Sequence, residues 1–446
     1  MFLYSKVKTF LREDPLIRRV LRNSGYLFSG NAISALLGFV QGVLMVRLLG
    51  IEQSGLVTAI LLFATNVNRL FSFRMSEVVT KYVGEVLAQE NMDRAAALAK
   101  WIGIAEAITS VLAYLVLFVL APWFSKDLAV VPLYRFYGLY LLANIVYETS
   151  TGVLQVTNKF DRVAFANLIQ GMVTFAIVLV AFIMQWGIFE ILTAYLIGKI
   201  IAAWIVTSSA VRELKRSVGH TWLRAPANLI PDWKSIGGFA VSTNINGTVN
   251  LFARDNIPLY IKYLLGDAAG NIALGYFNIA SKFITLVTLP LDPFIAPTYS
   301  EITRTIAQRQ WQATRKLLRQ VSLVGGAWTL ISGGGLVALG RWFIPLLYGT
   351  DAAPAYLCLV VLLIGYGFAN VLNWNRPFLL ALGHPNYPLM VAALTGAIEI
   401  ILIFLFAQSG GYLTVLAIFS GYLVVSIGWN VLRGLLILRH EEQQTA

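Results

Sequence analysis

The chain has 446 residues, of which 58% are hydrophobic and only 13% are charged, and its formal net charge is +12. Soluble globular proteins are closer to half apolar and about a quarter charged. This composition excludes an ordinary soluble domain. The positive charge does not require binding to nucleic acid, because Lys and Arg accumulate in the cytoplasmic loops of membrane proteins.

Apolar runs long enough to cross a bilayer recur along the whole chain. About 20 such residues span the hydrocarbon core as a helix, whereas barrel strands would show alternating segments of roughly ten residues. We therefore predict an all-α membrane protein. Its twelve transmembrane helices are expected at residues 24–46, 55–80, 101–121, 133–157, 163–185, 188–210, 235–261, 270–297, 320–340, 354–381, 387–407 and 412–434.

The distribution of Lys and Arg predicts the orientation of these spans. With the N-terminus inside, the cytoplasmic segments hold 23 of the 34 basic residues and the outer loops hold 5. Cytoplasmic loops carry the excess of basic residues, so both termini are expected in the cytoplasm. A linker at residues 211–234, which contains Pro226 and Pro231, separates the expected six-helix bundles at residues 1–210 and 235–446.

The two halves share short matches that occur in the same order. Leu-Leu-Gly ends the first span at residues 48–50 and the seventh at residues 264–266. Ala-Gln at 88–89 and Trp-Phe at 123–124 recur 219 residues later, and Ala-Asn at 143–144 recurs 226 residues later. Each half begins inside and has six spans, so the repeat is parallel, about a twofold axis along the membrane normal. Secondary transporters often bind substrate where such repeats meet.

Several of these segments resemble a known family. Residues 47–50 (Arg-Leu-Leu-Gly) with Gly55 after them, Lys81 and Tyr82 before an amphipathic stretch, and residues 381–386 (Ala-Leu-Gly-His-Pro-Asn) are similar to Wzx-type polysaccharide flippases. Those proteins belong to the multidrug/oligosaccharidyl-lipid/polysaccharide exporter superfamily.

The resemblance implies a transporter in the lipid bilayer rather than an enzyme. Its substrate would be an oligosaccharide on a polyprenyl diphosphate, moved from the cytoplasmic to the outer leaflet by alternating access. The glycan would serve the synthesis of O-antigen in lipopolysaccharide, of capsule or of exopolysaccharide, with polysaccharide polymerase machinery as a partner.

Polar faces on the second, seventh and eighth spans predict where the substrate binds. In the resembled family, the first two helices of each half line the central cavity. An ionisable group near the bilayer centre costs at least ~2.5 kcal/mol on insertion scales and so marks a functional candidate. Bases at successive depths would give a diphosphate one partner after another. The predicted contacts are Asn66, Arg69, Arg74, Asn246, Asn250, Arg254, Asn278 and Lys282.

These charges also have a plainer interpretation as structural pairs. Arg74 and Glu77 lie three residues apart and could neutralise each other, whereas Arg254 and Asp255 point in different directions on a helix.

The acids Glu77, Asp255 and Asp292 are candidates for binding a coupling ion, either a proton or sodium. We expect no catalytic residue, no metal site and no other cofactor. Pro290 and Pro293 favour a kink in the eighth span.

Three rival functions remain open. A cation-coupled drug or small-molecule exporter of the same fold should have more carboxylates than bases in its cavity. The cavity helices here carry four bases against three acids, which favours an anionic substrate. A flippase for the peptidoglycan precursor has two additional helices. A membrane polymerase or ligase usually needs a sizeable outer loop.

Overall fold

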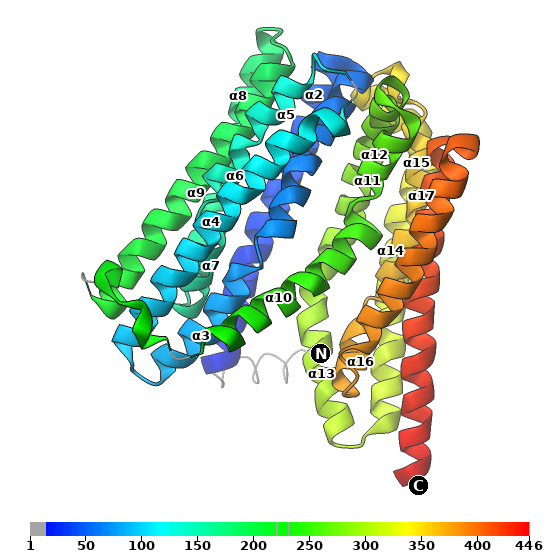
Figure 1. Cartoon of the computed structure of the whole chain (residues 1–446). Coiled ribbons are helices and arrows are strands. Elements are labelled where there is room, and N and C mark those ends of the chain that lie inside the picture. Colours follow the sequence, from blue (N-terminus) through cyan, green and yellow to red (C-terminus); the bar gives the residue numbers. More distant parts are fainter. Residues whose placement is uncertain (1–14, 126, 220–221, 231, 446) are drawn as a thin grey trace.

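The computed structural model describes residues 15–125, 127–219, 222–230 and 232–445. Every secondary-structure element in these ranges is a helix. Eight helical stretches in them are long and apolar enough to cross a membrane. Figure 1 shows the helices in two groups, one from each half of the chain. The prediction of an all-α membrane protein is confirmed, whereas the count of twelve spans, the twofold relation and the domain limits stay predictions.

The N-terminal group follows the chain from α2 to α9. Its helices are α2 (Pro15–Phe71), α3 (Met75–Ala88), α4 (Met92–Phe124), α5 (Val131–Tyr137), α6 (Leu139–Ala143), α7 (Tyr147–Val156), α8 (Phe160–Ile183) and α9 (Ile188–Val218). Two short 3₁₀ helices then lie in the predicted linker, η1 (Trp222–Arg224) and η2 (Ala227–Leu229).

The C-terminal group runs from α10 to α17. Its helices are α10 (Trp233–Asn250), the π-helix η3 (Leu251–Asp255), α11 (Ile257–Leu265), α12 (Asp267–Thr288), η4 (Leu289–Leu291), α13 (Asp292–Ala307), α14 (Trp311–Tyr348), η5 (Thr350–Ala352), α15 (Ala355–Val371), α16 (Asn375–Ala381) and α17 (Tyr387–Thr445). Helix α10 begins beside α3 and runs diagonally toward α11, so it lies between the two groups (Figure 1).

The repeated Leu-Leu-Gly motif has the same backbone conformation in both halves. Gly50 bends α2 with φ 77° and ψ 174°, and Gly266 separates α11 from α12 with φ 84° and ψ −179°. This region is accessible essentially only to glycine, which has no Cβ atom. Glu90 and Arg309, each one position after a repeated Ala-Gln pair, also share positive φ values of 57° and 55°. The sequence matches therefore mark equivalent turns.

Several predicted spans are interrupted inside the membrane. The second span breaks where Phe73 and Arg74 adopt φ values of 46° and 48° between α2 and α3. The seventh contains the π-helix η3, and the eighth changes to a 3₁₀ turn at Leu289–Leu291. This 3₁₀ turn contains Pro290 and lies directly before Pro293, and a proline removes a backbone donor and crowds the preceding turn. The kink itself stays a prediction.

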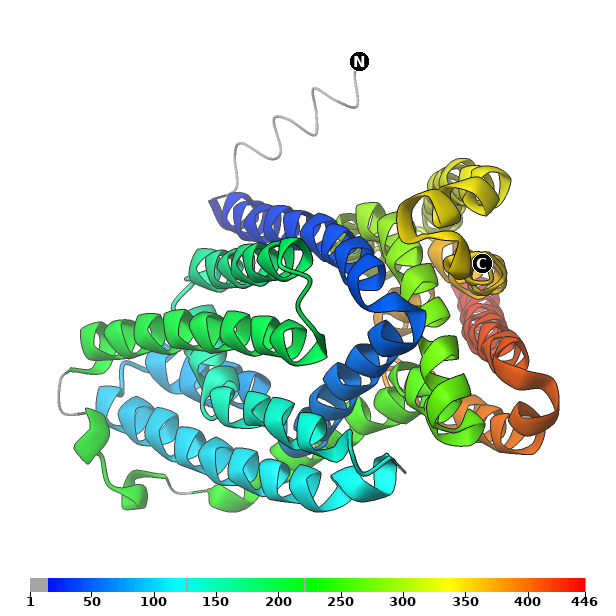
Figure 2. The same cartoon turned by 90° about the horizontal axis from the view of Figure 1, so that it is seen from above.

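Close backbone packing joins the two groups at the end away from the termini. A Cβ atom added at Gly55 on α2 would lie 1.7 Å from the carbonyl oxygen of Asn271 on α12. One added at Gly275 would lie 2.5 Å from the carbonyl oxygen of Ile51. The groups meet here and diverge toward the opposite end, and from above α2 lies at their border (Figures 1 and 2). On the predicted orientation this contact, which we name the outer closure, faces away from the cytoplasm.

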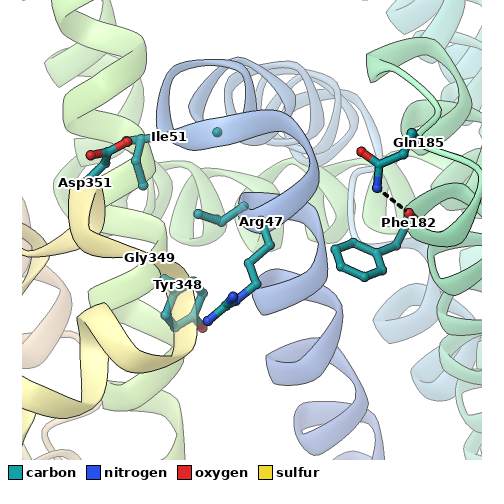
Figure 3. A pocket seen from close by; sticks show the side chains of 9 residues that line it. Arg47, Ile51, Phe182, Gln185, Tyr348, Gly349 and Asp351 are labelled. Carbon is teal, nitrogen blue, oxygen red and sulfur yellow. Dashed lines mark hydrogen bonds between the residues drawn. The ribbon is translucent and has the colours of Figure 1, made fainter.

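Arg47 adds a polar contact to the outer closure. Its guanidinium donates to the carbonyl oxygens of Leu346 and Leu347 at 2.5 and 2.6 Å, at the C-terminal end of α14. A cation is favourable there because the last carbonyls of a helix carry partial negative charge. A cavity of about 370 Å³ lies beside Arg47 and is also lined by Gln185 and Asp351 (Figure 3). Arg47 therefore links the N-terminal half of the chain to α14 of the C-terminal half.

The outward surface carries many large apolar side chains. Leu330, Ile331 and Leu346 on α14, for example, are 76%, 72% and 68% exposed. Such side chains would be costly against water but are stable against lipid, where the hydrocarbon core replaces water as the solvent. The charged residues of the spans must therefore find partners or water inside the protein.

Replacing Gly55 by alanine should open the outer closure. The added Cβ atom meets backbone rather than a flexible side chain, so α2 and α12 must separate by roughly 1.5 Å to regain ordinary contact. Spin labels at Gln53 and Thr350 should therefore show longer distances by pulsed electron resonance. Gly334→Ala on α14 is the control, because nothing lies within 4 Å of its added Cβ atom. An unchanged distance in Gly55→Ala would show that this contact does not hold the groups together.

Candidate functional site

Polar side chains of the second and seventh spans meet between the two helix groups. Arg69 forms an ion pair with Asp255, and the amide of Asn66 donates to Oδ1 of Asn256 at 2.7 Å. The side chains of Arg69 and Asp255 are 52% and 40% exposed, although both lie inside predicted spans. This exposure indicates open space between the groups, which we name the central gap. Asn66 is buried beside it and already bonded across the groups.

The π-helix η3 directs its two charged residues to different partners. Asp255 reaches Arg69, while the guanidinium carbon of Arg254 lies 5.7 Å from the centroid of the Tyr366 ring on α15. A π-helix widens the turn, and such segments are frequent at functional sites. Arg254 is exposed and has no ion-pair partner among the described residues. The expectation that Arg254 and Asp255 are not each other's partners is confirmed.

Arg74 stands at the break between α2 and α3. Its Nη1 atom lies 2.5 Å from Oε1 of Glu77, so the structural pair considered from the sequence is present. A Cβ atom at Gly247 on α10 would lie 3.0 Å from Nε of Arg74, so the glycine makes room for the guanidinium. Both charged side chains are nearly half exposed. Arg74 is therefore accessible in the central gap but already neutralised.

Lys282 on α12 packs against two glycines of α2. Its Nζ atom would lie 3.6 Å from a Cβ atom at Gly38, and its Cε atom 3.6 Å from one at Gly42. Its neighbours Phe39, Phe283 and Tyr348 form a cluster of perpendicular rings. No hydrogen bond or ion pair from Lys282 occurs within the described part of the chain. Lys282 is thus a half-buried cation at the border of the groups, without a compensating charge.

The other predicted site residues make fewer described contacts with the central gap or are already paired. Asn278 is half-buried on α12, and Asn250 is exposed at the end of α10 and engaged in a contact. Asp292 is exposed at the start of α13. The side chain of Asn246 lies outside the described residues. Glu77 and Asp255, predicted for ion coupling, are both taken up in ion pairs with arginine.

Two buried carboxylates were not predicted as part of the site. Glu106 on α4 and Glu399 on α17 are each only 2% exposed. Glu106 accepts the backbone N–H groups of Glu148 and Thr149 at 2.8 and 2.7 Å, so it caps the start of α7. Neither oxygen of Glu399 has a hydrogen-bond partner in the described structure. An acid inside an apolar run was the available signal, but sequence spacing cannot say which acid finds donors.

Comparison with solved structures identifies the fold. The fold matches a multidrug resistance MATE family transporter of the MOP superfamily in an inward-facing conformation, with a TM-score of 0.72, 10% identity, and 93% and 96% of the two chains covered. It also matches the lipid II flippase MurJ in an inward closed conformation, with a TM-score of 0.71, 15% identity, and 94% and 90% covered. The chain therefore shares the fold of these two proteins.

Comparison of the sequence identifies the protein family. Residues 20–303 match the family of polysaccharide biosynthesis proteins, and the chain belongs to this family. The inner membrane protein YghQ of Escherichia coli K12 is 24% identical over 352 residues, which cover 77% of this chain and 96% of that protein. The resemblance to polysaccharide flippases predicted from the sequence is confirmed.

A double-mutant cycle on Arg69 and Asp255 should separate substrate contact from structural pairing. If Arg69 binds the substrate, Arg69→Gln and the double variant with Asp255→Asn should lose polysaccharide export equally, because neither retains the cation. If the pair is only structural, the double variant should recover, since no unpaired charge is left. We expect no recovery, measured as surface polysaccharide per inserted protein. Recovery to near the wild-type level would remove Arg69 from the site.

Proposed function

We propose that this protein moves a polyprenyl-diphosphate-linked oligosaccharide from the cytoplasmic to the outer leaflet, for the synthesis of a surface polysaccharide. Membership of the polysaccharide biosynthesis family supports a role in glycan assembly. The transporter fold supports movement across the membrane rather than catalysis. The bilayer then carries the lipid part of the substrate, and the polymerase machinery would receive the glycan outside.

One observation carries the choice of an anionic head group. Lys282, packed between α12 and α2, and Arg254, next to Asp255 in η3, have no acidic partner among the described residues, and Arg69 and Arg74 stand in exposed ion pairs. An uncompensated cation in a membrane interior is costly, so it is retained where a ligand supplies the opposite charge. Arginine can bind a phosphate through two parallel N–H groups, and lysine offers a compact charge.

The arrangement supports alternating access as the mechanism. The groups are joined at the outer closure and diverge toward the predicted cytoplasmic side, which is the geometry expected for loading from the inner leaflet (Figure 1). The diphosphate would pass Arg74 first, then Arg69 and Lys282, and then Arg254. To bind, it must share or displace Glu77 and Asp255, which lowers the net gain at those two arginines. The polyprenyl tail would stay in lipid.

A cation-coupled drug or small-molecule exporter is the alternative within the same fold. Such a substrate would need free carboxylates in the central gap. Glu77 and Asp255 are already paired with arginine, and Asp292 is the exposed acid of the three that lacks a described partner. The charge pattern therefore favours the anionic substrate.

Replacing Lys282 by glutamine should abolish most export while the protein still inserts. The change keeps a polar side chain of similar length and removes the charge. A charge-assisted contact contributes roughly 1.5–3 kcal/mol, so its loss should weaken head-group binding about ten- to a hundredfold. The measurement is surface polysaccharide in a strain that depends on this protein, normalised to the amount of protein in the membrane.

Lys316→Gln is the matched control, because Lys316 is exposed on α14 near its N-terminal end, in a predicted cytoplasmic segment. It should export at the wild-type level. Normal export by Lys282→Gln would mean that this lysine is tolerated without a ligand, and the proposal of an anionic head group at Lys282 would then fail.

A further inference from the structure

Glu399 is a buried carboxyl group for which the packing provides no donor. It lies 12 residues after the start of α17, which is roughly 18 Å along the helix and therefore near the middle of the ~30 Å hydrocarbon core. Its side chain is 2% exposed, and neither oxygen has a hydrogen-bond partner among the described residues. An ionised carboxylate buried in this way costs far more than a neutral carboxylic acid.

The contrast with Glu106 shows that burial alone does not explain Glu399. Both glutamates lie inside predicted spans and are equally buried. Glu106 accepts two backbone N–H groups at the start of α7, so its structural role is plain. Glu399 performs no such role in the described structure. Burying a carboxyl group without a hydrogen bond lowers the stability of the protein, so we expect Glu399 to have a role other than a structural one.

Glu399 lies one helical turn from the contact between α17 and the π-helix η3. A Cβ atom at Gly396 would lie 2.5 Å from Cβ of Ala253, so the two helices touch at backbone distance there. The next residues of η3 are Arg254 and Asp255, and Asp255 holds Arg69 of the other helix group. Any change of charge at Glu399 therefore acts on the segment that carries the cross-group ion pair.

The titratable and charged groups around Glu399 come from several elements. Tyr260 of α11 and Tyr422 of α17 lie within electrostatic range of its carboxyl group, and Tyr422 is also in range of Arg254 and Asp255. Tyr366 of α15 contacts Arg254, which has no acidic partner among the described residues. Lys262 of α11 is already bound to Asp267 and Asn271. Arg254 directly follows Ala253 at the contact with α17 and is a cation without an acidic partner among the described residues.

We propose that Glu399 is a proton-binding site that couples proton movement to the change between inward- and outward-facing states. The neutral, protonated carboxyl group is the form that tolerates burial without hydrogen-bond partners in the present conformation. Loss of the proton leaves a carboxylate that attracts Arg254, shifts η3 and strains the ion pair between Asp255 and Arg69. The step is a plain protonation and needs no other reactant. The inference rests on the proposed transport function but not on the identity of the substrate.

The test measures conformation without substrate. Spin labels at Gln89 and Gln308, the equivalent exposed turns of the two halves, report the separation of the groups on the predicted cytoplasmic side in lipid nanodiscs. Cys358, the single cysteine of the chain, is buried and can be replaced by alanine. In the otherwise unaltered protein the distance distribution should change between pH 6 and pH 10. Glu399→Gln, which imitates the neutral acid, should keep the low-pH distribution at both values.

Glu106→Gln is the matched control and should keep the full response to pH, even where it lowers thermal stability. A full response in Glu399→Gln would overturn the proposal, as would a high-pH distribution at both values. A shift produced by sodium chloride at constant pH, and absent with potassium chloride, would replace the proton by sodium and also overturn it. Loss of export in Lys282→Gln with an intact pH response would leave this inference standing, so the two proposals fail separately.

Discussion

The need to compensate charge inside the membrane governs the rest of this structure. Hydrocarbon offers no hydrogen bonds, so each interior ionisable group must pair within the protein, border water or await a ligand. Arg69 and Asp255 pair across the two helix groups, Arg74 pairs with Glu77, and Glu106 caps a helix. Lys282, Arg254 and Glu399 lack an opposite charge in the described structure. We assign functions to these three, whereas Lys199, which also lacks an ion pair in the described structure, lies over the rings of Tyr140 and Tyr147.

The same constraint explains the irregular helices. The breaks at Phe73–Arg74 and at η3 lie close in the chain to Arg69 and Asp255 at the central gap, where water or protein can satisfy the freed backbone groups. The outer closure packs backbone on backbone at Gly55 and Gly275. One end of the molecule is thus held by close packing, and the other contains segments that can change shape. That asymmetry suits two groups that rock about the outer contact.

Much of this architecture could be predicted from the sequence. The lengths of the apolar runs predicted helices. The repeated Leu-Leu-Gly motif predicted turns that have the same conformation at Gly50 and Gly266. The prolines of the eighth span lie at its 3₁₀ turn. Partners could not be predicted, because they depend on contacts between distant segments. Helical spacing placed Arg69 on a polar face but could not reveal Asp255, 186 residues away, as its partner. It also gave no means of separating Glu399, which lacks donors, from Glu106, which has two.

The central claim is that the uncompensated cations of the central gap recognise a lipid-linked diphosphate. Its most direct test is equilibrium binding of undecaprenyl diphosphate and of uncharged undecaprenol to the purified protein and to Lys282→Gln. The account predicts that the diphosphate binds more tightly than the alcohol to the unaltered protein, and that the variant loses about tenfold or more of that preference. Equal binding of both lipids, or an unchanged preference in the variant, would contradict the account.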